Sequence, residues 1–327
     1  KIARSGGDPI LERQKNKGLQ ATLIHCTKKV HQINLPTWRN DKFGKQWIAS
    51  FEHHVFPVIG NLPISQVSSA DILRVLTPIW NTKGDTARKI KQRLRMVIKW
   101  SRAQGYYQGD DPVELAEQAL PKQPRSDEHH KSLEFEKLPE IIQQLRKSKI
   151  SAPTKSALEF TILSACRTNE VLNAQWSEID LLKKLWIIPG KRMKAGKEHQ
   201  VPLTKSMIDI LNTAKKTIVS NDLIFPSDIN GKILSNNTMR LALKKRLNVD
   251  ATVHGMRSSF KVWASETTNF ANEVSEMALA HAISNKTEAA YRRGNLMEKR
   301  RQLMQKWDDY LNNKNVKVIE FYKTMEI

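Results

Sequence analysis

Four short segments in the second half of the chain carry side chains that can bind or act on a phosphate. In the first, Arg167 is followed one helical turn later by Glu170, where one predicted helix ends and the next begins. A buried arginine needs a carboxylate or another anion beside it. In the second, His254 and Arg257 stand three residues apart at the start of a predicted helix, so both can face one site. A helix amino terminus also favours an anion.

The other two segments are a basic turn and a histidine that precedes a tyrosine. The turn, KRMKAGK at 191–197, is predicted to be the tip of a hairpin and can reach a phosphate or a leaving oxygen. Its basic residues are Lys191, Arg192, Lys194 and Lys197. His281 is followed, after nine residues, by Tyr291. Each segment alone has a plainer explanation: a structural Arg–Glu pair, a solvated charged turn, or an ordinary core or surface aromatic.

The elements that must position these segments are mainly helices. In the second half, helices are predicted over 133–147 and 152–164, and a third begins near Thr168. The pattern then changes to two short apolar strands, at 185–188 and 201–203, which form a hairpin. Helices resume from about residue 205. The sequence therefore predicts an α+β fold that is mainly α, with one small β-hairpin or sheet.

The first half is predicted to be helical from about residue 21 to 118. One helix covers 41–58, and Ser69 is expected to cap the next. A third helix, over 85–102, buries an apolar stripe made of Ile90, Leu94, Val97 and Ile98. Its other faces carry cations that either lie along DNA phosphates or face solvent. These cations are Arg88, Lys89, Lys91, Arg93, Arg95 and Lys99.

Composition favours nucleic acid as the partner. The 327 residues include 54 Lys and Arg against 33 Asp and Glu, a net charge of +21. Both halves are basic, with +10 over 1–131 and +11 over 132–327, which indicates a polyanion bound by both. No apolar run is long enough to span a bilayer, and no secretory signal is recognisable. Two cysteines outside any CxxC pair fit a reducing cytoplasm and predict no zinc cluster.

Taken together and in order, six of these residues match the signature of the tyrosine recombinases, the phage integrase family. They are Arg167, Lys194, His254, Arg257, His281 and Tyr291. Residues 167–203 and 253–311 further resemble prophage and genomic-island integrases of the satellite-phage type. Two positions depart from the family pattern: Ser164-Ala165 replace the usual Thr-Gly, and Ala280 stands where glycine is common.

The resemblance implies a helical core-binding domain and a tyrosine-recombinase catalytic domain that form a clamp round DNA. Residues 1–20 would be a linker or the end of a missing arm-binding domain, and 21–118 the core-binding domain. The polar stretch within 119–131 would be the interdomain linker, and 132–327 the catalytic domain with a C-terminal tail helix. The implied partners are double-stranded DNA at attachment sites, three further copies in a homotetramer, and accessory DNA-bending and excision proteins, in a bacterial cytoplasm and without a membrane.

The resemblance also implies the chemistry. The Tyr291 hydroxyl would attack a DNA phosphate and form a 3′-phosphotyrosine, with no metal, ATP or other cofactor. The two arginines would bind the non-bridging oxygens, His254 is the candidate base and Lys194 the candidate acid for the leaving 5′-hydroxyl. His281 would hydrogen-bond the phosphate and support the tyrosine. Glu170 would orient the first arginine or a neighbour.

Three other functions compete with an integrase. A DNA-binding regulator could keep the fold without catalysis, although the intact set of six residues argues against it. A type IB-like topoisomerase would share the chemistry without exchanging strands between partners. A metal-dependent nuclease would need a carboxylate cluster for magnesium, which the sequence does not offer.

Overall fold

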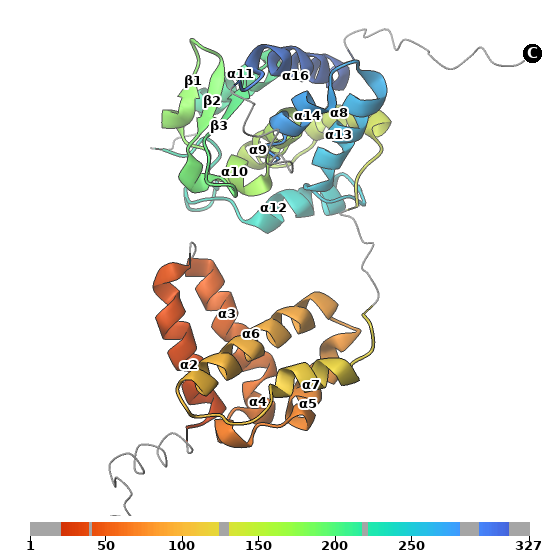
Figure 1. Cartoon of the computed structure of the whole chain (residues 1–327). Coiled ribbons are helices and arrows are strands. Elements are labelled where there is room, and N and C mark those ends of the chain that lie inside the picture. Colours follow the sequence, from red (N-terminus) through yellow and green to blue (C-terminus); the bar gives the residue numbers. More distant parts are fainter. Residues whose placement is uncertain (1–20, 39–40, 124–130, 218–221, 282–293, 314–327) are drawn as a thin grey trace, which may run out of the picture. The chain divides into compact units, whose positions relative to one another are not determined.

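The structure, a computed structural model, describes residues 21–38, 41–123, 131–217, 222–281 and 294–313. By their internal contacts the residues divide into two compact units, Lys1–Ser126 and Asp127–Ile327 (Figure 1). Residues 1–20 and most of the predicted linker lie outside the described residues. Within the described ranges, no helix has the length and apolar character needed to cross a membrane.

The first unit is built from helices packed on one apolar core. They are α2 (Leu23–Asn34), α3 (Asp41–His54), α4 (Phe56–Ile59), α5 (Ser69–Trp80), α6 (Gly84–Ala103) and α7 (Pro112–Ala119), with 3-10 turns η2 (Leu35–Thr37) and η3 (Ile64–Gln66). Helix α6 contacts α2, α3, α5 and α7. The apolar stripe predicted for this helix is fully buried, so its cationic faces point away from the core.

Two local predictions for this unit were wrong. The helix expected over 41–58 is broken, because α3 ends at His54 and α4 begins at Phe56. Pro57 lies in the first turn of α4, where its missing N–H is tolerated, so it does not end the helical segment. The cap of α5 is Ser68 rather than Ser69. The Ser68 N–H donates to the Asp71 carboxylate at 3.0 Å, which completes a capping box.

The second unit combines helices with a three-stranded antiparallel sheet of order β1-β2-β3. The strands are β1 (Ile179–Asp180), β2 (Leu185–Ile188) and β3 (His199–Pro202). The α-helices are α8 (Leu138–Lys147), α9 (Ala152–Ser164), α10 (Thr168–Leu172), α11 (Lys205–Thr217), α12 (Asn236–Leu241), α13 (Gly255–Thr267), α14 (Asn272–Ala278) and α16 (Met297–Leu311). Shorter turns are η4 (Phe135–Lys137), η5 (Trp176–Glu178), η6 (Gly190–Arg192) and the π-helical η7 (Ala242–Arg246).

Most of the predicted elements of this unit are present, with differences at their ends. Helix α9 and strand β2 have the predicted bounds. The helix expected from residue 133 begins only at Leu138, after the η4 turn. Strand β3 begins at His199, two residues before its predicted start, and β1 was not predicted. Because β1 has only two residues, it carries no alternating pattern and is defined by its pairing with β2.

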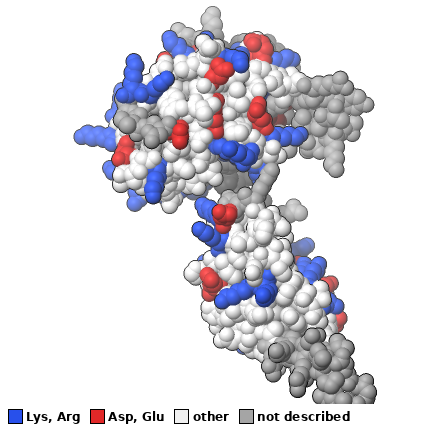
Figure 2. Space-filling view, turned by 90° about the vertical axis from the view of Figure 1, so that its left-hand side faces the viewer, with Lys and Arg blue, Asp and Glu red and all other residues white. Residues whose placement is uncertain are grey.

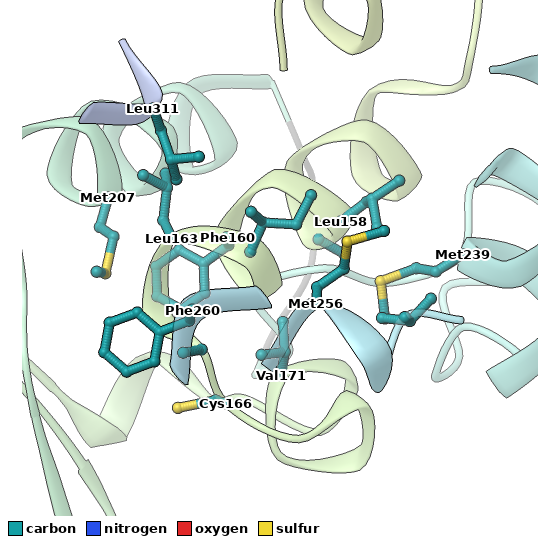
Figure 3. Packing of buried hydrophobic residues seen from close by; sticks show 14 of the residues in the cluster. Leu158, Phe160, Leu163, Cys166, Val171, Met207, Met239, Met256, Phe260 and Leu311 are labelled. Atoms are coloured by element: carbon teal, nitrogen blue, oxygen red, sulfur yellow. The ribbon is translucent and has the colours of Figure 1, made fainter. Parts of the chain in front are cut away.

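Helix α9 is the centre of the second core. Its residues are buried on every face from Ala157 to Ser164, as expected of a helix enclosed by other elements. Trp307 of α16 donates its indole N–H to the Ile162 carbonyl at 3.0 Å and packs edge-on against Phe260 of α13. Figure 3 shows side chains of α9, α11, α13 and α16 meeting in this core. The helices that carry the candidate site are therefore fixed on one shared support.

The start of α13 is set by a close approach of two backbone segments. The Thr252 N–H donates to the Lys131 carbonyl at 2.9 Å. A methyl group added at Gly255 would lie 2.2 Å from that carbonyl oxygen, so only glycine fits. This contact fixes the first turn of the helix that carries Arg257.

Candidate active site

Arg167 is positioned by the turn between α9 and α10. Ala165 ends α9 in the left-handed conformation, with φ of 50°, and Arg167 is the N-cap of α10. The Arg167 backbone N–H donates to Glu170 Oε2 at 2.8 Å, and Arg167 Nη1 donates to Glu170 Oε1 at 2.9 Å. Glu170 is buried, whereas the Arg167 side chain keeps 25% of its surface exposed. The carboxylate thus orients the guanidinium and leaves part of it accessible.

Arg257 meets the same turn from α13. The side chain is buried, and its Nη1 donates to the Ala165 carbonyl. Its Nη2 donates to the Leu279 carbonyl at 2.7 Å and lies 3.3 Å from His281 Nε2. Arg167 Nη2 reaches the neighbouring Ala280 carbonyl at 3.4 Å. Two arginines 90 residues apart in the sequence therefore meet at the turns at Ala165 and Leu279–Ala280.

His281 follows α14 and completes this group. Its Nδ1 lies 2.6 Å from Glu276 Oε2, and Glu276 also accepts from Lys261 Nζ at 2.7 Å. An ionised carboxylate can only accept, so Nδ1 carries a proton toward Glu276, and Nε2 faces Arg257. With 41% of its side chain exposed, His281 borders solvent beside the two arginines.

The remaining members of the predicted set lie at the edges of this group or outside the described residues. His254 directly precedes α13 and is exposed, three residues before Arg257. Lys194 is exposed in the turn between β2 and β3, just after η6. Tyr291 falls in 282–293, outside the described residues. The contacts above therefore join Arg167, Glu170, Arg257 and His281. The predicted roles of all seven residues stay predictions.

Two buried residues next to this group were missed by the sequence analysis. His199 of β3 is 8% exposed and Arg300 of α16 is 3% exposed. Burial lowers the pKa of His199 to about 3, and the charges of Arg300, Arg257 and Arg167 act in the same direction. Burial likewise lowers the pKa of Arg300 to about 10. The imidazole is therefore neutral, and the guanidinium still carries its charge at neutral pH.

A signal for both residues was present in the sequence. Arg300 extends the apolar stripe of the last helix, made of Leu303, Met304, Trp307 and Leu311, by one turn onto the same buried face. His199 alternates with Val201 on the buried face of β3. A polar residue at a core-facing position is unusual, so this placement could have marked both.

The predicted DNA contacts divide into paired and exposed groups. Lys91 and Arg95 pair with Glu117, and Arg88 pairs with Asp85. Two others are also used within the chain: Arg93 donates to Ser50 Oγ, and Arg192 donates to the Glu178 carboxylate and the Glu170 carbonyl. Exposed cations are Lys89, Lys191 and Lys197. Figure 2 shows Lys and Arg side chains spread over the visible face of each unit.

Comparison with known families decides the class of this chain. Residues 131–297 match the model described as "Phage integrase family", and residues 24–118 match "Phage integrase central domain". The chain belongs to the phage integrase family. This family comprises site-specific recombinases that act through a tyrosine, and the fold predicted from the sequence is confirmed as mainly helical with a small antiparallel sheet.

Individual relatives agree with this assignment. Prophage integrase IntA of Escherichia coli K12 is 30% identical over 264 residues, 80% of this chain and 63% of the relative. The integrase of Enterobacteria phage P4 is 27% identical over 338 residues, 96% of this chain and 76% of the relative. A lambda integrase tetramer bound to a Holliday junction shares the fold, with a TM-score of 0.67 at 16% identity, over 85% of this chain and 82% of that chain. The integrase-family chain thus spans about two thirds to three quarters of these sequence relatives.

Both departures from the family pattern fall at left-handed residues. Ala165 has φ of 50° and Ala280 has φ of 49°. A Cβ in this conformation costs about 1–2 kcal/mol, which glycine avoids. We expect Ala165→Gly and Ala280→Gly each to raise the free energy of unfolding by about 1 kcal/mol, measured by urea denaturation.

The matched control is Ala157→Gly, which lies inside α9 and should lower the free energy of unfolding. Equal losses at all three positions would contradict a strained backbone at the two turns.

His199 gives the second unit a dependence of stability on pH. The unfolded histidine, with a pKa of about 6.5, binds a proton that the folded one, at about 3, does not. Above pH 6.5 the protonation of His199 should therefore cost the folded protein no stability. The free energy of unfolding should fall by up to about 1.4 kcal/mol per pH unit as pH drops below that value.

Denaturation curves at pH 7.5, 6 and 5 measure this slope before the carboxylates titrate. In His199→Gln the decrease in the free energy of unfolding between pH 6 and 5 should be smaller than in wild type, whatever the stability at pH 7.5. Identical slopes in both proteins would show that another group is responsible.

Proposed function

We propose that this integrase-family chain cleaves and rejoins DNA at attachment sites through a covalent 3′-phosphotyrosine at Tyr291, and so integrates or excises a mobile element. The observation that carries the proposal is the convergence of Arg167, Arg257 and His281 on the turns at Ala165 and Leu279–Ala280. Forked guanidinium donors next to a partly exposed imidazole suit the non-bridging oxygens of a phosphodiester. The family assignment supplies the reaction class.

The proposed chemistry conserves one phosphodiester bond at each step. The Tyr291 oxygen attacks phosphorus in line, the bond to the 5′ oxygen breaks, and His254 accepts the phenol proton. Lys194 donates a proton to the leaving 5′ oxygen. Charge that gathers on the non-bridging oxygens is stabilised by Arg167 and Arg257. A second 5′-hydroxyl then attacks the phosphotyrosine and reseals the strand, so no ATP is consumed.

The proposed substrate is double-stranded DNA, bound largely through its phosphates by both basic units. A lambda integrase dimer bound to a COC′ core site, at 18% identity and a TM-score of 0.63, supports this proposal, as does the tetramer on a Holliday junction. By analogy we propose four protomers on two duplexes during recombination. Accessory DNA-bending and excision proteins are further candidate partners.

The covalent adduct is the direct test of this function. We expect the wild-type chain to form a protein–DNA adduct on a nicked suicide substrate that carries the attachment core, visible on a denaturing gel. Tyr291→Phe should form none. Arg257→Ala should lower the rate of adduct formation by at least about 100-fold while DNA affinity changes only a few-fold, because the arginine acts mainly in the transition state.

Arg146→Ala is the matched control, since Arg146 is a partly exposed arginine paired with Glu159 in the same unit. It should leave adduct formation unchanged. Specific binding by wild type without any adduct would favour a DNA-binding regulator. Relaxation of arbitrary supercoiled plasmid by a monomer would instead favour a type IB-like topoisomerase.

Metal removal distinguishes this mechanism from a nuclease. Adduct formation and resealing should proceed at the same rate in excess chelator, because guanidinium groups take the place that divalent ions hold in many nucleases. Loss of cleavage in chelator, with recovery on adding magnesium, would point to a metal-dependent nuclease.

A further inference from the structure

Helix α16 is tied to the sheet beside the candidate site by several side-chain contacts. Arg300 Nη2 donates to the Gln200 carbonyl in β3. Arg301 donates to the Lys183 carbonyl at 2.8 Å and to the Lys184 carbonyl at 3.2 Å, just before β2. Asn295 Nδ2 donates to Gln200 Oε1 at 3.2 Å. The helix is therefore joined to strand β3 and to the turn that precedes β2.

The contact with β3 holds one strand of the hairpin whose turn carries Lys194, the proposed acid. Helix α16 begins six residues after Tyr291. Strand β3 begins five residues after Lys194. A displacement of β3 from α16 would thus move the turn that carries the proposed acid relative to the rest of the second unit.

Burial of the charged Arg300 side chain costs free energy that a merely structural contact would not require. It is 3% exposed, and within the described residues no carboxylate forms an ion pair with it and its Nε has no hydrogen-bond partner. A buried cation without a carboxylate is unfavourable, and an apolar side chain of similar size would pack more stably at such a position. The positive charge of Arg300 lowers the pKa of His199 and of Cys166, and the charge of Arg257 lowers both in the same way. Arg300 therefore belongs to the same charged cluster as Arg257.

We propose that Arg300 is a positioning residue for strand cleavage. It holds β3, at the base of the hairpin that carries Lys194, against α16, so that the acid reaches the scissile phosphate. This inference rests on the proposed function.

Arg301 provides a matched control for Arg300. It is the next residue of α16, it also donates to backbone carbonyls of the sheet, and its contacts are exposed. If contact with the sheet alone were needed, the two arginines would be of similar importance. If the buried cation at the hairpin base is needed, only Arg300 matters.

The test uses single-turnover cleavage of two suicide DNA substrates that differ in one atom. One has the ordinary 5′ bridging oxygen at the scissile phosphate, and the other has sulfur there. In the sulfur substrate the P–S bond breaks and the thiolate leaves without a proton, because a thiol has a pKa of about 8.5. A variant that is impaired only in proton donation to the leaving oxygen should therefore cleave the sulfur substrate at the wild-type rate.

We expect Arg300→Gln to cleave the oxygen substrate about 100-fold more slowly than wild type and the sulfur substrate within a few-fold of wild type. Lys194→Ala should show the same pattern. Arg300→Lys, which keeps the charge, should lose less than Arg300→Gln. Arg301→Gln should cleave both substrates within a few-fold of wild type.

Other outcomes would overturn the inference. Equal losses of Arg300→Gln on both substrates would place its effect on the tyrosine, the phosphate or the fold, and no loss on either would remove its role. If Arg300→Gln does not fold by circular dichroism, Arg300→Lys decides by the same comparison, where a loss restricted to the oxygen substrate supports the proposal. Absence of any wild-type adduct would instead refute the proposed function itself.

Discussion

Arg257 keeps its charge inside the protein because backbone carbonyls hold it. Within the described residues it forms no ion pair, and its Nη atoms donate to the carbonyls of Ala165 and Leu279. Carbonyl oxygens orient a guanidinium group without neutralising it, so the positive charge remains available to an anion. To aim those carbonyls inward, the chain must turn sharply at Ala165 and Ala280, which explains the left-handed backbone at both. The backbone strain at the two turns thus follows from the use of their carbonyl groups to bind Arg257.

The carbonyls can serve this purpose only if the elements that bear them are rigid. Ala165 directly follows α9, which is enclosed by other elements of the second unit, and Trp307 fastens α16 to the Ile162 carbonyl three residues earlier. Arg257 extends from α13, whose first residue, Gly255, lies against the Lys131 backbone. The apolar core therefore sets the geometry of the charged group, although no apolar residue belongs to that group. A substitution that creates a cavity in this core would therefore displace both the Arg257 guanidinium group and the carbonyls that accept its hydrogen bonds.

The sequence predicted the parts of this arrangement that depend on local pattern or family signature. Helix α9 and strand β2 were found because their apolar runs end at clear breaks, and the six-residue signature was found because its order along the chain is distinctive. What it could not predict depends on distant partners. Lys91 and Glu117 are 26 residues apart, so nothing local shows that this cation is already paired. Arg300 and Gln200 are 100 residues apart, and only the folded chain shows that the last helix holds the hairpin.

The basic residues of this chain therefore differ in what their charge is used for. Cations paired with carboxylates, such as Lys91 and Arg95, stabilise a unit and offer little to a polyanion. Exposed cations such as Lys89 and Lys197 can release counterions on DNA, which gives affinity and its salt dependence. A buried guanidinium group held by carbonyls, such as that of Arg257, offers little surface to a polyanion, and under the proposed function it would act on a single phosphate. A net charge of +21 suits a polyanionic partner. The proposed chemistry would use two arginines held in place by their neighbours, Arg257 by backbone carbonyls and Arg167 by Glu170.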